Sequence, residues 1–185
     1  MKRFTMWALF AIVALIISVS TAGCTSNVAN QASNTGNQTS SASLNMATYE
    51  SGNFTIQYPS DWKNATLRTT FSDSFSVLSG GTSVTAMSMN MSVGSLSSYS
   101  NSRIETLKSN SNYTLIESGN TTLAGNPAYK AVYTFSYGGG TPTKIMEIWT
   151  IKDGKTYTIT YQALPETYDA YAETAQKMIN SFQIK

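Results

Sequence analysis

A two-residue turn, Asp153-Gly154, separates two β-rich segments, residues 145–152 and 157–163, near the end of this 185-residue chain. A type I′ hairpin needs positive φ at both central positions, and Asp-Gly adopts this conformation readily. The second segment alternates apolar residues from Tyr157 to Tyr161 with threonines, so one face is apolar and the other polar. The two segments are therefore predicted to be antiparallel neighbours with one face in a core.

Strand patterns dominate the rest of residues 46–163. Runs of β-branched and aromatic residues bounded by turn residues predict further strands at 54–58, 67–71, 75–78, 82–91, 113–123 and 128–137. In the last of these, Tyr129, Tyr133, Phe135 and Tyr137 fall on one side. We expect helices to cover such apolar faces.

Two segments supply those helices. After Leu164-Pro165, apolar residues recur at helical spacing, from Tyr168 to Phe182. A weaker pattern at 97–108 offers Ile104 and Leu107 for burial. Residues 46–185 are therefore predicted to form one α+β domain with two main helices on a central antiparallel sheet.

The N-terminal sequence has the pattern of an export signal. Lys2 and Arg3 precede an apolar stretch from Met6 to about Val19, and small residues precede Cys24, the sole cysteine. This pattern predicts a lipoprotein signal peptide at residues 1–23 and a lipid on Cys24, which would hold the protein at the outer face of the cell membrane. The alternative is an uncleaved anchor, although the apolar core is shorter than the roughly 20 residues that span a bilayer.

Residues 24–45 carry the predicted lipid site and then an uncharged Ser-, Asn- and Thr-rich run. A flexible chain of this length spans roughly 25 Å, so it is predicted to be a tether. Asn-x-Ser/Thr acceptor sequences occur in the tether and in the domain, at Asn37, Asn53, Asn64, Asn90, Asn112 and Asn120. They are N-glycosylation candidates if the source cell modifies exported proteins.

Charge gives little attraction to nucleic acid or anionic lipid. Without Lys2 and Arg3, the twelve basic residues fall to ten and equal the ten acidic ones. Nucleic acid is therefore not an expected partner, and membrane attachment would depend on the lipid at Cys24.

The residue types also limit the catalytic options. The chain contains no histidine, which excludes Ser-His-Asp triads, Cys-His pairs and His-ligated zinc sites. Glu166, Asp169 and Glu173 share one side of the last predicted helix, but Lys177 follows Glu173 at the spacing of a surface ion pair. Gly138-Gly139-Gly140 precedes a strand, which is not the setting of a phosphate cradle. No catalytic residue and no cofactor is predicted.

One cluster suggests metal chemistry. Met87, Met89 and Met91 alternate along a predicted strand and would project from one face, and thioethers are suitable ligands for Cu(I). The alternative is that these side chains pack beneath a helix, as methionines commonly do.

Four stretches resemble the PsbP-like family, which includes the photosystem II extrinsic protein, related bacterial and archaeal lipoproteins, and Mog-like proteins. They are Phe54-Thr55-Ile56-Gln57-Tyr58-Pro59-Ser60-Asp61-Trp62, Gly125-Asn126-Pro127-Ala128-Tyr129, Gly154-Lys155-Thr156-Tyr157-Thr158-Ile159-Thr160-Tyr161 and Met178-Ile179-Asn180-Ser181-Phe182. The resemblance implies an α-β-α sandwich built on a central antiparallel sheet. Each stretch is a packing or turn motif, so the resemblance bears on fold more than on function.

The chain departs from the plant members of that family. The resemblance implies metal-binding positions that include histidine in those plant members. This sequence contains no histidine. A photosynthetic role is therefore not expected. We expect a membrane-tethered lipoprotein outside the cytoplasm whose role is non-enzymatic binding or assembly support, with an envelope protein as partner. The alternative is a lipoprotein that binds a small ligand or a metal such as Cu(I), and an enzyme is the least favoured class.

Overall fold

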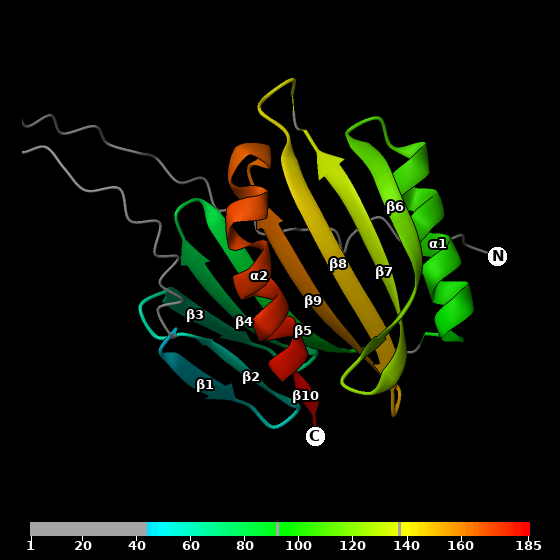
Figure 1. The fold of residues 1–185 in the computed structure, drawn as a ribbon. Helices are drawn as coiled ribbons and strands as arrows, with labels where there is room; N and C mark the ends of the chain where they lie inside the picture. Colours follow the sequence, from blue (N-terminus) through cyan, green and yellow to red (C-terminus); the bar gives the residue numbers. More distant parts are fainter. Residues whose placement is uncertain (1–43, 92, 137) are drawn as a thin grey trace, which may run out of the picture. The chain divides into compact units, whose positions relative to one another are not determined.

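The computed structural model describes residues 44–91, 93–136 and 138–185 (Figure 1). In this part of the chain, seven strands form one sheet in the order β3-β4-β5-β9-β8-β7-β6, and every neighbouring pair is antiparallel. The strands are β3 (Lys63–Arg68), β4 (Ser72–Ser79), β5 (Thr82–Asn90), β6 (Tyr113–Leu123), β7 (Asn126–Phe135), β8 (Thr143–Lys152) and β9 (Lys155–Ala163).

The β8–β9 hairpin confirms the prediction made from the Asp-Gly turn. Asp153 and Gly154 have φ values of 51° and 74°, and Lys152 pairs with Lys155 across the turn. Both central residues therefore have the positive φ that a two-residue hairpin turn requires.

A second, smaller sheet shares no strand pairing with the first. Its order is β1-β2-β10, with β1 (Met46–Glu50), β2 (Phe54–Pro59) and β10 (Gln183–Ile184), and both pairings are antiparallel. The Phe54 ring lies 5.3 Å from that of Phe182, and the Tyr49 ring stacks on Phe75 of β4 at 4.1 Å between centroids. The small sheet therefore packs on the core of the large one.

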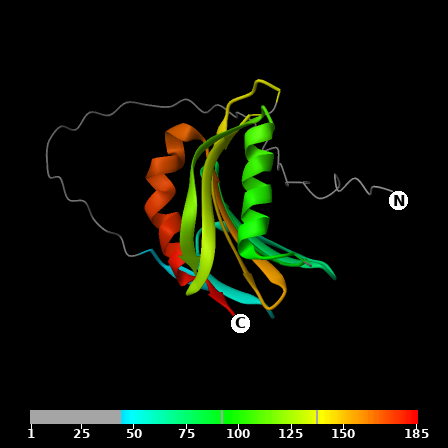
Figure 2. The same cartoon turned by 90° about the vertical axis from the view of Figure 1, so that its right-hand side faces the viewer.

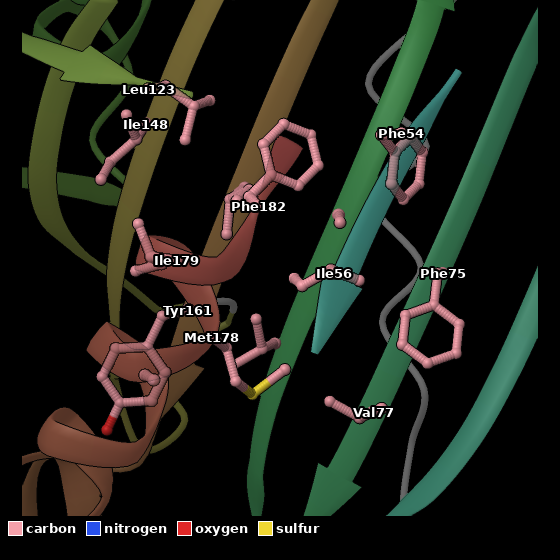
Figure 3. Close-up of a cluster of buried hydrophobic side chains, with 14 of the residues drawn as sticks. Phe54, Ile56, Phe75, Val77, Leu123, Ile148, Tyr161, Met178, Ile179 and Phe182 are labelled. Atoms are coloured by element: carbon pink, nitrogen blue, oxygen red, sulfur yellow. The ribbon is translucent and has the colours of Figure 1, made fainter. Parts of the chain in front are cut away.

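Helix α2 (Pro165–Ser181) packs on the same face of the large sheet. Pro165 occupies the first helical turn, where its missing N–H costs no hydrogen bond. Ala175, Met178 and Ile179 are buried against the sheet, and the Tyr161 hydroxyl donates a hydrogen bond to the carbonyl of Tyr168. Figure 3 shows side chains from α2, the small sheet and β4 meeting in this core.

Helix α1 (Leu96–Ser109) covers the opposite face of the large sheet, and Figure 2 shows the two helices on either side of it. The Ser95 side chain accepts a hydrogen bond from the N–H of Ser98 and so caps the helix N-terminus. Ile104 and Leu107 are buried against a second cluster that contains Tyr133 and Trp149. The aromatic side predicted for β7 is therefore the side that α1 covers.

The predicted architecture of two helices on one central sheet is wrong. The domain is mostly β, with antiparallel sheets of three and seven strands and two helices among the described residues. Residues 46–50 and 183–184 pair with β2 and hold it outside the large sheet. The alternation of β2 indicates a strand but does not specify its partners, so the sequence pattern could not separate the two sheets.

Candidate functional site

Phe71, in the turn between β3 and β4, and Leu67, on β3, are the most exposed large apolar residues among those that the structure describes. Phe71 is 70% exposed and Leu67 is 57% exposed, whereas most large apolar side chains of the described residues lie in the core. The strand predicted through residue 71 ends at Arg68, so Phe71 lies in the turn. Ile116, on β6, is 55% exposed and lies outside this turn.

Hydrogen bonds that the Thr69 hydroxyl accepts hold the turn in shape. Its hydroxyl accepts from the N–H of Phe71 at 3.2 Å and from the N–H of Ser72 at 2.9 Å. Asn90, at the end of β5, donates its N–H to the carbonyl of Phe71 at 2.8 Å. A Thr side chain that bonds to the backbone nearby can replace ladder hydrogen bonds, and here it ends β3 before Phe71.

A cavity of about 240 Å³ opens beside this turn. It lies between the β3–β4 turn, the end of β5 and the turn that joins β1 to β2, and we call it the tip cavity. Its lining includes Asn53, Arg68, Phe71, Asp73, Ser88 and Asn90.

Charges at the tip cavity are paired. The Asp73 carboxylate is buried, lies 3.4 Å from Nε of Arg68 and accepts a hydrogen bond from the Tyr49 hydroxyl at 3.3 Å. Arg68 also donates to the Tyr49 oxygen at 3.1 Å. Lys155 donates to Oδ1 of Asn53 at 2.6 Å. The charges of Arg68 and Asp73, which line the tip cavity, therefore offset each other, whereas Lys155 keeps its charge and is not a lining residue.

A second hollow of about 500 Å³ lies between α2 and the β6–β7 turn. Its lining includes Ile148 and Ile179, which already belong to the core, and Lys130, whose Nζ lies 2.6 Å from Glu117. None of its lining residues is aromatic, so it lacks the exposed ring of the tip cavity.

A buried ion pair joins α1 to β8. Arg103 pairs with Glu147, and their side chains are 19% and 8% exposed. The Tyr133 hydroxyl donates to Glu147 at 3.4 Å, and the Arg103 guanidinium lies 5.0 Å from the centroid of the Trp149 ring. Nε1 of Trp149 donates to Ser100 of α1 at 2.9 Å. These contacts satisfy the carboxylate and fasten the helix, which is a structural arrangement.

This cluster predicts a pH effect on stability. Burial, and then the charge of Glu147, raises the pKa of Tyr133 above the usual value of about 10. The folded state therefore favours the neutral phenol, so its contribution is present below about pH 10 and is lost as the pH rises above that value. We expect the free energy of unfolding to fall between about pH 9 and 11.5, and to fall less steeply in Tyr133→Phe.

Urea unfolding across that pH range measures the effect. Tyr58→Phe, which removes a hydroxyl from a half-buried tyrosine of β2, is the matched control. Equal pH slopes for Tyr133→Phe and the wild type would contradict the prediction.

The acidic residues of α2 lie at the surface. Glu173 forms the ion pair with Lys177 that the spacing predicts, at 2.8 Å, and both side chains are exposed. This pairing lowers the pKa of Glu173. Asp169 is also exposed and lies 3.9 Å from Lys144. Together with the exposed Glu166, these carboxylates do not converge on a cavity.

The predicted methionine cluster is only partly on one strand. Met87 and Met89 are half-buried on β5 and pair with Thr158 and Thr156 of β9, whereas β5 ends at Asn90 and Met91 lies beyond it. The described residues bring no group of three or more Asp, Glu or Cys side chains together for a metal ion. Copper binding by the methionines stays a prediction.

Cys24 and Asn37 lie outside the described residues, so the lipid site and the first acceptor sequence stay predictions. Among the described helices, none is long and apolar enough to span a membrane. Asn53 and Asn90 line the tip cavity, Asn64 and Asn120 are exposed on β3 and β6, and Asn112 is half-buried before β6. Whether these sites carry glycans is likewise a prediction.

The tip cavity was not predicted from the sequence. Its parts lie far apart in the chain, from Asn53 to Asn90, and only the tertiary fold brings them together. The local signal was the Thr69 side chain, three residues before Ser72, which marks a turn within the predicted strand.

The chain is similar to one protein family and to several solved structures. A family model described as PsbP-like protein matches residues 8–184. The solution structure of cyanobacterial PsbP from Synechocystis sp. PCC 6803 is similar with a TM-score of 0.57 at 14% identity, covering 81% of this chain and 98% of that one. LpqN of Mycobacterium tuberculosis, involved in cell envelope biogenesis, gives 0.49 at 11% identity, covering 76% and 90%.

No curated protein matches the chain. The match to cyanobacterial PsbP, at its low identity, bears on the fold alone. The family model, however, spans almost the whole sequence. The chain therefore belongs to the PsbP-like protein family.

Proposed function

We propose that this chain is a non-catalytic binding module, held at the outer face of the cell membrane by a lipid on Cys24, and that it contacts an envelope component through the tip cavity and its rim. The observation that carries the proposal is the exposure of Phe71 at the rim of the tip cavity. A cavity that combines an aromatic side chain with a few polar groups is typical of a binding site.

The pairing of the buried carboxylates supports a non-catalytic role. Glu147 is held by Arg103 and Tyr133 beneath α1, and Asp73 is held by Arg68 and Tyr49. General acid–base chemistry needs a carboxyl group free to exchange a proton with a substrate. Each of these carboxylates instead contacts an arginine and a tyrosine hydroxyl of the same domain.

Photo-cross-linking at the tip tests the proposal. A photoreactive phenylalanine analogue replaces Phe71 in the full-length protein in source cells, and we expect an adduct upon irradiation. The analogue at Ile116, which is similarly exposed on β6, is the matched control and should give none. Cys24→Ser should abolish both membrane retention and the adduct.

Equal adducts at positions 71 and 116 would show that the tip is not the contact surface. Retention of Cys24→Ser in the membrane fraction would overturn the proposed lipid anchor.

A further inference from the structure

We infer that the tip cavity binds an uncharged sugar unit of a saccharide chain; this inference rests on the proposed function and names the class of its ligand. The ligand would stack on Phe71 and place its hydroxyl groups among the polar side chains of the cavity. The proposed ligand of the chain is therefore a neutral carbohydrate.

The cavity has the size of a subsite. Ligand pockets for drug-sized molecules measure about 300–1,000 Å³, and the tip cavity is smaller, at about 240 Å³. It therefore suits one ring-sized unit, with the rest of a longer chain extending into solvent past the exposed Phe71.

The charge balance selects against an anion. Arg68 at the wall is paired with Asp73, so a phosphate or sulfate that approached the guanidinium would also meet a carboxylate. Lys155 donates to the Asn53 side chain and is not among the residues that line the cavity. A neutral ligand meets no such repulsion.

The polar side chains of the tip cavity can form hydrogen bonds with the hydroxyl groups of a sugar. Asp73 offers acceptor oxygens, and Arg68 and the side-chain amide of Asn90 offer N–H donors. Ser88, which lies opposite Asp73 on the neighbouring strand, offers a hydroxyl that both donates and accepts. A sugar hydroxyl also both donates and accepts. A few fixed polar groups of this kind give a pocket its specificity.

Phe71 supplies the apolar contact. Its ring is 70% exposed and lines the cavity. The face of an aromatic ring is electron-rich, so it attracts the weakly positive C–H groups that line one face of a sugar ring. Binding would also remove this exposed apolar surface from water.

Such a sugar has two sources. One is an envelope polysaccharide, and the other is a glycan on this chain, since the acceptor residues Asn53 and Asn90 lie in the lining. The chemistry is the same for both, and a comparison of two preparations of the protein distinguishes them.

Calorimetric titration tests the inference. Full-length protein from a host without N-glycosylation, in a detergent that has no sugar headgroup, is titrated with glucose, mannose, galactose and N-acetylglucosamine, and with sodium sulfate as the anionic probe. We expect at least one neutral sugar to bind with millimolar affinity and sulfate not to bind. Phe71→Ser should weaken sugar binding at least tenfold, and Ile116→Ser should leave it unchanged.

Several results would overturn the inference: no sugar binding, sulfate binding alone, or equal binding by Phe71→Ser and wild type. Phe71 is exposed, so its variant should fold, and equal urea midpoints check this. A photo-adduct at position 71 without sugar binding would reject the inference but keep the proposed function, whereas loss of the adduct itself would reject the function.

The protein from source cells identifies the origin of the sugar. If a glycan of the chain fills the cavity, that preparation should bind added sugar more weakly than the unglycosylated one, and enzymatic deglycosylation should restore binding. If the sugar belongs to an envelope polysaccharide, the two preparations should bind equally.

Discussion

Replacing Glu147 by alanine is expected to lower the free energy of unfolding by about 3–5 kcal/mol, the usual cost of removing one partner of a buried ion pair. The substitution leaves the Arg103 guanidinium, 19% exposed, without its carboxylate. It also removes the acceptor for the Tyr133 hydroxyl. Urea unfolding followed by tryptophan fluorescence would report the loss, because Trp149 lies beside Arg103.

Two further variants serve as controls for the Glu147→Ala measurement. Glu173→Ala removes the partner of Lys177 in an exposed pair and should lower the free energy of unfolding far less than Glu147→Ala does. The double variant Arg103→Met with Glu147→Leu replaces the pair by apolar groups and should recover most of the stability. A Glu147→Ala loss no larger than that of Glu173→Ala would show that the pair does not fasten α1.

Truncation of Phe54 to alanine should cost about 3–5 kcal/mol, as expected for a buried aromatic ring. Phe54 is fully buried and packs against Phe182 and Tyr49, so it links the small sheet to the core beneath α2. Because the two sheets share one core, we expect a single unfolding transition at lower urea concentration. Calorimetry and circular dichroism together would show whether one transition remains.

Ile116→Ala, at an exposed position of β6, is the control and should change stability by less than about 0.5 kcal/mol. An additional early transition in Phe54→Ala would contradict a shared core, because it would mean that the small sheet unfolds separately.

Local signals predicted much of the fold. The β8–β9 hairpin was predictable because its turn conformation depends on two adjacent residues. Helix α2 was predictable because Pro165 and the helical spacing of its apolar residues act within one segment. The PsbP-like resemblance was confirmed by the family model.

Pairings between distant segments were not predictable. β10 is two residues long and becomes a strand only because β2 is available beside it. The same holds for the ion pair of Arg103 and Glu147, whose residues are 44 positions apart. No local periodicity encodes such contacts, so neither the small sheet nor the tip cavity could follow from the sequence pattern.

Tyr49 gives the tip a mechanical link to the N-terminal segment. Tyr49 belongs to β1, an edge strand that pairs with β2 from Met46 to Glu50, and its hydroxyl holds both Arg68 and Asp73. Tension applied through the N-terminal segment enters the domain at Met46 and passes along β1 toward that hydroxyl. Force on the N-terminal segment would therefore reach the large sheet at the wall of the tip cavity, where Arg68 of β3 and Asp73 of β4 contact the Tyr49 hydroxyl.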